Sequence, residues 1–189
     1  MPPNFPLPKT SDNTLPEIIA LCQKVAPGQR ALYLEIEPVE GAIVNECYGN
    51  VDKAIQKSGG SVQYGWQIWD TMPGVMAEAE FHAVWKDADG NLHDVTPKEM
   101  PDIAKILFLP DPKRSYEGRQ IDNIRIALKN DPLVHSFIKN AESYFEVTNR
   151  GELADYHGEI VATPEMRNLM QKNAEIFLAI VQKFYSTQP

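Results

Sequence analysis

The chain has 189 residues, of which 43% are hydrophobic and 23% are charged, a composition typical of globular proteins rather than of disordered or fibrous ones. Its 18 Lys and Arg against 26 Asp and Glu give a net charge of −8 without any basic block, so we expect no nucleic-acid partner. No stretch approaches the roughly 18 apolar residues of a membrane span, and we expect a soluble cytoplasmic protein with no membrane contact.

The N-terminal region predicts an arm, a helix and a strand. Residues 1–14 are rich in proline and predict an extended arm before a single domain over residues 15–189. Apolar residues recur at helical spacing over 14–26, where Thr14 is a candidate N-cap and Pro16 fits the first turn. Cys22 belongs to the apolar stripe and is expected to be a buried hydrophobe. The segment 31–39, ALYLEIEPV, then predicts a strand.

The segment 41–60, GAIVNECYGNVDKAIQKSGG, predicts a helix that ends at the glycine pair Gly59-Gly60. Cys47 lies near its start. Two interpretations stay open: Asn45 caps a helix that includes Cys47, or Asn50 caps a shorter helix and the cysteine lies in the turn before it.

Three strands are predicted next, at 61–70, 76–87 and 91–97, with alternating apolar residues typical of a half-buried sheet. In the second, His82 shares a face with Glu80. A three-residue loop at 88–90, with Gly90 in a left-handed conformation, would pair residue 84 with Asp94 and bring His82 and Asp94 to one face as diagonal neighbours. A two- or four-residue loop would place them on opposite faces.

The C-terminal half changes from strand to helix. IAKILFLP (103–110) predicts another strand, and helices are predicted to begin at Pro132 and Pro164. The fold class is therefore α+β, with an antiparallel meander-like sheet flanked by helices and a helical C-terminal part. We expect the sheet core at about 30–110 and the helical part at about 118–187.

Cys47, His82 and Asp94 follow one another in the order that thiol catalysis requires. A free thiol is only slightly ionised at neutral pH, whereas an adjacent imidazole and a helix N-terminus both favour the reactive thiolate. A carboxylate then holds the imidazole in the correct tautomer. These residues predict a nucleophile, a base and an orienting acid, with no cofactor.

This layout resembles the transglutaminase-like branch of the papain-like thiol enzymes over residues 43–97. The matching residues are Cys47, YGW at 64–66, HAVW at 82–85 and DVTP at 94–97. Two features depart from that family: Val95 and Thr96 separate the aspartate from the proline, and Cys47 lacks a Gly-Xaa-Cys-Trp setting. The resemblance implies catalytic Cys47, base His82 and orienting Asp94. A group of bacterial proteins with the same layout is also similar, and it implies no activity.

The hypothesis that follows is a thiol-dependent amide or acyl hydrolase or transferase, with a small-molecule or peptide substrate. Trp66 and Glu80 are candidate substrate-binding residues beside the predicted site. One alternative is a non-catalytic binding or regulatory domain, in which the cysteine is a buried hydrophobe and the histidine a satisfied polar residue. A second is a zinc protein, because Cys47, His82 and Asp94 are all acceptable zinc ligands, with Glu80 as a possible fourth. The sequence does not predict the oligomeric state.

Overall fold

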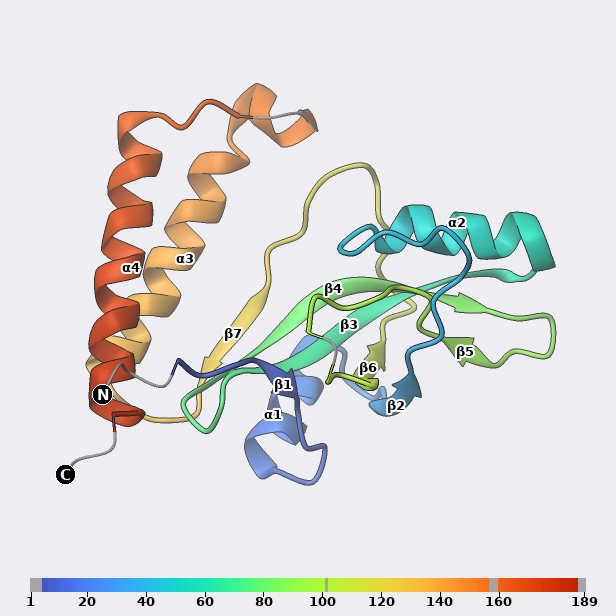
Figure 1. The fold of residues 1–189 in the computed structure, drawn as a ribbon, viewed down its shortest axis with the longest axis horizontal. Coiled ribbons are helices and arrows are strands. Elements are labelled where there is room, and N and C mark those ends of the chain that lie inside the picture. The colour runs from blue at the N-terminus through green and yellow to red at the C-terminus, as the bar shows by residue number, and fades with distance from the viewer. Residues whose placement is uncertain (1–4, 101, 157–159, 187–189) are drawn as a thin grey trace.

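The structure is a computed structural model, and it describes residues 5–100, 102–156 and 160–186. These residues form seven strands, four α-helices and one short 3-10 helix in an α+β arrangement (Figure 1). The strands are β1 (Lys9–Thr10), β2 (Leu32–Glu35), β3 (Ser61–Met72), β4 (Met76–Lys86), β5 (Leu92–His93), β6 (Lys105–Pro110) and β7 (Ile124–Ala127). The helices are α1 (Pro16–Val25), α2 (Cys47–Ser58), α3 (Pro132–Thr148), η1 (Gly151–Asp155) and α4 (Pro164–Phe184).

All described strand pairs are antiparallel, and the main path of the sheet runs β2-β6-β3-β4-β5. The long hairpin β3–β4 forms its centre, and the short β1 pairs with β3. On its other edge, β4 pairs with β7 over residues 76–79 and with β5 over residues 85–86. The described strands therefore leave residues 80–84 of β4 without a neighbour on that edge. His82 lies in this gap.

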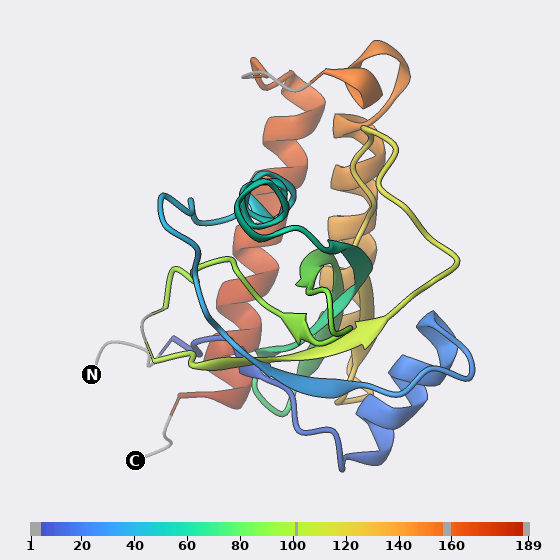
Figure 2. The same cartoon turned by 90° about the vertical axis from the view of Figure 1, so that its right-hand side faces the viewer.

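The helices cover different parts of the sheet. Helix α1 packs its buried residues against the central strands, and α2 packs Val51 and Ala54 against Ala83 of β4. Helices α3 and α4 form a hairpin that stands at one end of the sheet, over the turn between β3 and β4 (Figures 1 and 2). None of the described helices has the length and apolar character needed to cross a bilayer.

Most predicted elements are present, with shifts at their ends. Helix α1 begins at Pro16 as predicted, but its N-cap is Leu15; Thr14 instead bonds to Asp12. The arm is not wholly free of regular structure, because β1 joins the sheet. Parts of three predictions lie outside the described residues: 1–4 of the arm, 101 of the sheet core, and 157–159 and 187 of the helical part. The helical part begins at Pro132 rather than near 118, because the preceding chain forms a loop and then β7.

Candidate functional site

The structure brings His82 and Asp94 into a buried pair. The imidazole Nε2 lies 3.0 Å from Asp94 Oδ1, and the two residues are 5% and 0% exposed. The Thr96 backbone N–H also donates to Asp94 Oδ1, at 3.2 Å. Because the carboxylate accepts at Nε2, it fixes the imidazole tautomer and leaves Nδ1 for another partner.

The hairpin after β4 has the three-residue loop that this pairing requires. Trp85 pairs with His93, and the Asp87 N–H donates to the Asn91 carbonyl at 2.9 Å. Gly90 has a φ of 89°, in the left-handed region, and the Asp87 carboxylate accepts from the Asn91 N–H at 2.8 Å. The register expected from an 88–90 loop is therefore present, and it places His82 and Asp94 as diagonal neighbours.

Cys47 is the first residue of α2, and neither predicted asparagine caps that helix. The N-cap is Glu46, whose side chain makes no capping hydrogen bond, so the first N–H groups of α2 keep their capacity to donate. Asn45 lies just before the cap with a φ of 64°. The thiol is 8% exposed and packs against Val51, Ala83 and Val95. A helix N-terminus favours a negative charge at this position.

The Cys47 side chain also interacts with the His82 imidazole. Burial alone would lower the pKa of His82, but the hydrogen bonds that the imidazole donates to Asp94 and Cys47, together with the Asp94 charge, outweigh it and raise that pKa to about 9. Burial likewise opposes ionisation of Asp94, yet the His82 and Lys98 interactions hold the pKa of this carboxyl below its ordinary value. Both shifts favour an imidazolium paired with a carboxylate.

Lys98 extends the pair to a third buried charge. Its Nζ lies 2.8 Å from Asp94 Oδ2 and donates to Gln67 Oε1 at 3.0 Å, and its side chain is 9% exposed. Gln67 lies on β3, two residues after Gly65, which is the partner of His82 in β4. The Asp94 carboxylate is thus held between an imidazole on one oxygen and an ammonium on the other.

A second set of contacts ties the loop before α2 to the segment after Asp94. Asn50 is fully buried; its amide oxygen accepts from the Ile43 N–H at 2.9 Å, and its amide nitrogen donates to the Ile43 carbonyl at 2.7 Å and to Thr96 Oγ1 at 3.3 Å. Asn45 donates to Glu99 Oε1 at 2.9 Å. Asn50 therefore holds the approach to Cys47 rather than capping its helix.

A cavity of about 1080 Å³ adjoins this region between the sheet and the α3–α4 hairpin. Residues on both sides of Cys47 in the sequence, Glu46 and Tyr48, line it, as does Glu80 of β4. The Cys47 side chain itself is not part of the lining. Tyr48 stacks on Tyr116 with ring centroids 3.8 Å apart, and both rings line the cavity. Tyr48 also packs against the buried cluster that contains Cys47, so this aromatic wall of the cavity adjoins the surroundings of the thiol.

The two predicted substrate-binding residues have different positions. Trp66 is fully buried in the core, where its indole N–H donates to Asp111 Oδ2 at 3.1 Å, so the prediction that it contacts substrate is corrected to a packing role. Its place on the apolar face of β3, opposite Phe81, causes this burial. Glu80 is exposed and lines the cavity, and it accepts from the Trp69 indole N–H at 2.7 Å.

The described residues contain no site with the geometry that the zinc alternative requires. No three His, Cys, Asp or Glu side chains there are grouped so as to hold a metal ion. His82 instead lies between Cys47 and Asp94, and the second oxygen of Asp94 pairs with the Lys98 ammonium. His93, which follows on β5, is held between Glu37 and Asp87 at 3.0 Å from each.

Lys98, Gln67 and Asn50 were missed by the sequence reasoning. One sequence feature points to the role of Lys98: it lies four residues after Asp94, just beyond Pro97, close enough in the chain to pair with that carboxylate. Gln67 alternates with apolar residues in a strand, a pattern equally typical of a solvent-facing side chain.

No protein-family model, curated protein or solved structure matches the chain.

Proposed function

We propose that this protein is a thiol-dependent enzyme that cleaves or transfers an acyl group at an amide or ester bond. The observation that carries the proposal is the buried His82–Asp94 pair, 3.0 Å between Nε2 and Oδ1, beside a cysteine that is the first residue of a helix and packs in one cluster with Ala83 of β4. Thiol enzymes place their nucleophile beside an imidazole and a helix N-terminus, and Cys47 has this position.

The proposed reaction has two half-reactions. The Cys47 thiolate attacks the acyl carbon and forms a tetrahedral intermediate; as this intermediate collapses, His82 donates its proton to the leaving amine or alcohol, which leaves a thioester on Cys47. A water or an amine then attacks the thioester. His82 accepts the proton of this second nucleophile, and the thiolate is released. Asp94 keeps the imidazole oriented throughout.

The start of α2 supplies donors for the oxyanion of each intermediate. Glu46 makes no side-chain capping bond, so the backbone N–H groups at Cys47 and Tyr48 are open to a ligand oxygen at the positive end of the helix dipole. Donors of this kind stabilise the charge that develops in the transition state.

The test is the rate at which iodoacetamide alkylates native Cys47 between about pH 5 and about pH 9, with each cysteine resolved by mass spectrometry. Cys22 is the internal control, because burial raises its pKa to about 11 and it should stay inert. The proposal predicts a reactive Cys47 at neutral pH whose advantage over Cys22 is lost in His82→Ala. A Cys47 that reacts only after unfolding would refute the enzyme and favour a binding or regulatory domain.

A further inference from the structure

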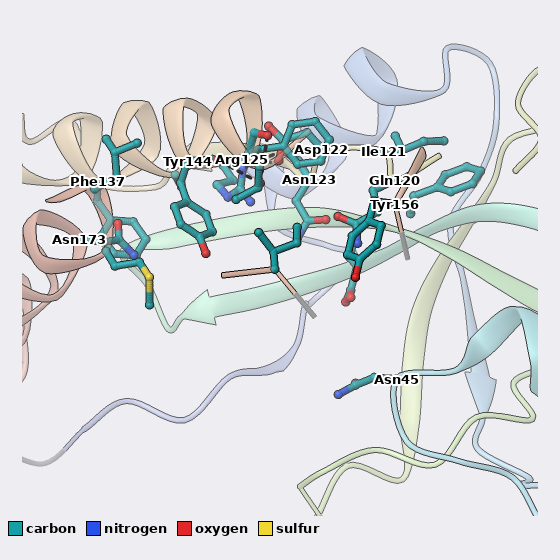
Figure 3. A pocket seen from close by; sticks show the side chains of 18 of the residues that line it. Asn45, Gln120, Ile121, Asp122, Asn123, Arg125, Phe137, Tyr144, Tyr156 and Asn173 are labelled. Carbon is teal, nitrogen blue, oxygen red and sulfur yellow. Dashed lines mark hydrogen bonds and ion pairs between the residues drawn. The ribbon is translucent and has the colours of Figure 1, made fainter. Parts of the chain in front are cut away.

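The cavity beside Cys47 is large and extends well beyond the reacting groups. Its lining begins at the N-terminus of α2, crosses β4 and β7, and reaches the facing sides of α3 and α4. In Figure 3, Asn45 lies at one side, whereas Phe137 and Asn173 lie far from it on the helical hairpin. Its volume of about 1080 Å³ is at the upper limit of ordinary small-molecule sites, about 1000 Å³. The space suits an extended chain.

The charges on the lining are predominantly negative. The charged residues there are Glu46, Glu80, Asp122 and Arg125. Arg125 is already neutralised, since its guanidinium lies 3.1 Å from Glu78 and 3.0 Å from Asp122. The two remaining carboxylates, Glu46 and Glu80, flank the start of α2, and both residues are exposed. The end of the cavity next to Cys47 is therefore electronegative.

The opposite end is aromatic. Phe137, Tyr144 and Phe145 of α3 and Phe177 of α4 line it, and Figure 3 shows Tyr144 between Phe137 and Arg125. Aromatic faces bind apolar side chains, and they also attract cations. The lining thus offers an anionic subsite near the thiol and an aromatic one farther away.

We propose that the cavity selects acyl substrates in the form of basic peptide segments, with a Lys or Arg side chain held by Glu46 and Glu80 at the end of the cavity that adjoins the start of α2, and an apolar or aromatic residue held against the α3–α4 hairpin. This inference rests on the proposed function, because it names the substrate class of the same thiol. Glu46 and Glu80 act as specificity-determining residues and leave the reacting groups unchanged.

The charge at the thiol can be measured without turnover. Native protein is treated with two methanethiosulfonate reagents of similar size, a trimethylammonium cation and a sulfonate anion, and the modification rate of Cys47 is compared for each. Iodoacetamide, which is neutral, reports the intrinsic reactivity. The test variants are Glu46→Gln and Glu80→Gln, since glutamine keeps the shape and, at residue 80, an acceptor for Trp69. Glu142→Gln is the control, because Glu142 is exposed on α3 and lies outside the cavity lining.

The cation should react faster than the anion in the native protein, and each test variant should lower this ratio by roughly fivefold, because one charge several ångströms away in water is worth about the thermal energy to each reagent. The control variant should leave the ratio unchanged. If Cys47 reacts with iodoacetamide but shows equal rates for both ions, the substrate inference is overturned while the thiol enzyme stands. If Cys47 reacts with none of the three, the proposed function itself fails.

Peptide protection tests the rest of the inference. Acetyl-Phe-Arg-amide and acetyl-Phe-Glu-amide are compared as protectors of Cys47 against iodoacetamide. We expect the basic peptide to slow alkylation at concentrations where the acidic peptide has no effect, and Phe177→Ala to weaken that protection. Equal protection by both peptides, or protection that Glu46→Gln and Glu80→Gln leave intact, would overturn the assignment of the anionic subsite.

Discussion

Lys98→Met is the perturbation that most directly tests the buried charge arrangement. The substitution keeps an unbranched side chain one atom shorter but removes the ammonium that lies 2.8 Å from Asp94 Oδ2. Breaking a fully buried ion pair costs ~3–5 kcal/mol, because the other charge stays buried without its partner. Here the imidazole of His82 still faces the carboxylate, so we expect a smaller loss of unfolding free energy, about 2–3 kcal/mol.

Two measurements follow from that reasoning. Urea denaturation of a chain of this size should show the loss directly, together with a fall in melting temperature of roughly 5–10 °C. The Lys98 charge also lowers the pKa of His82, so its removal should move the titration of His82, followed by NMR on isotope-labelled histidine, above its value of about 9. Lys139→Met, at an exposed position on α3, should change stability by less than about 0.5 kcal/mol.

The reasoning would be refuted if the Lys98→Met protein were as stable as the native one, or if the pKa of His82 were unchanged or lower in that variant. The second readout separates an electrostatic role from a merely structural one. A local packing defect would lower stability without moving the titration of the imidazole in a fixed direction.

Three further predictions concern the same region. The pKa of His82 in the folded protein, about 9, lies above the ordinary value of 6.5. Its protonation therefore adds about 3 kcal/mol to the free energy of unfolding, in full below about pH 6.5, and this contribution is lost as the pH rises through about 9. The difference in unfolding free energy between the native protein and His82→Gln, measured by urea denaturation at several pH values, should shrink over that window. Catalysis by the proposed mechanism should fall over the same alkaline range. Tyr116→Ala should speed alkylation of Cys47 several-fold by opening the Tyr48–Tyr116 stack, whereas Tyr116→Phe should not, and equal rates in the two variants would contradict the aromatic wall. Asn50→Ala should lower the unfolding free energy by about 1–3 kcal/mol in urea denaturation, because it removes the hydrogen bonds that the buried amide makes to the backbone of Ile43 and to Thr96, and a loss below about 0.5 kcal/mol would mean that water replaces the amide.

Much of the fold follows from local sequence signals. The proline-started helices α3 and α4 begin at Pro132 and Pro164 with Asp131 and Thr163 as caps, because an N-cap side chain followed by proline is a short-range signal. The hairpin β3–β4 follows from its alternation. The insertion of β6 between β2 and β3 depends on contacts between residues distant in the chain, which no local pattern specifies.

The candidate site was predictable to the extent that its geometry is local. His82 and Asp94 are twelve residues apart on a hairpin, and counting through an 88–90 loop places them as neighbours. Of the two interpretations of the helix start, the one that includes Cys47 in the helix is correct, but the cap is Glu46 rather than Asn45. Glu46 makes no side-chain capping bond, so no capping signal in the sequence identified it. Trp66 was predicted at the substrate rather than in the core, because alternation identifies the two faces of a strand without saying which face a helix covers.

The short segment from Asp94 to Glu99 has a consequence for how this protein tolerates change. Asp94 holds the imidazole, Thr96 accepts from Asn50, and Glu99 accepts from Asn45. The loop before Cys47 and the imidazole of His82 are therefore both held by the segment 94–99. The distance between the nucleophile and the base depends on these six consecutive residues rather than on how far apart α2 and β4 lie in the sequence. Insertions in the 36–46 loop should be absorbed by its length. A single residue inserted between Asp94 and Thr96 would shift the contacts that hold the loop before Cys47 relative to the contact that holds His82. The strands of the sheet would stay in place.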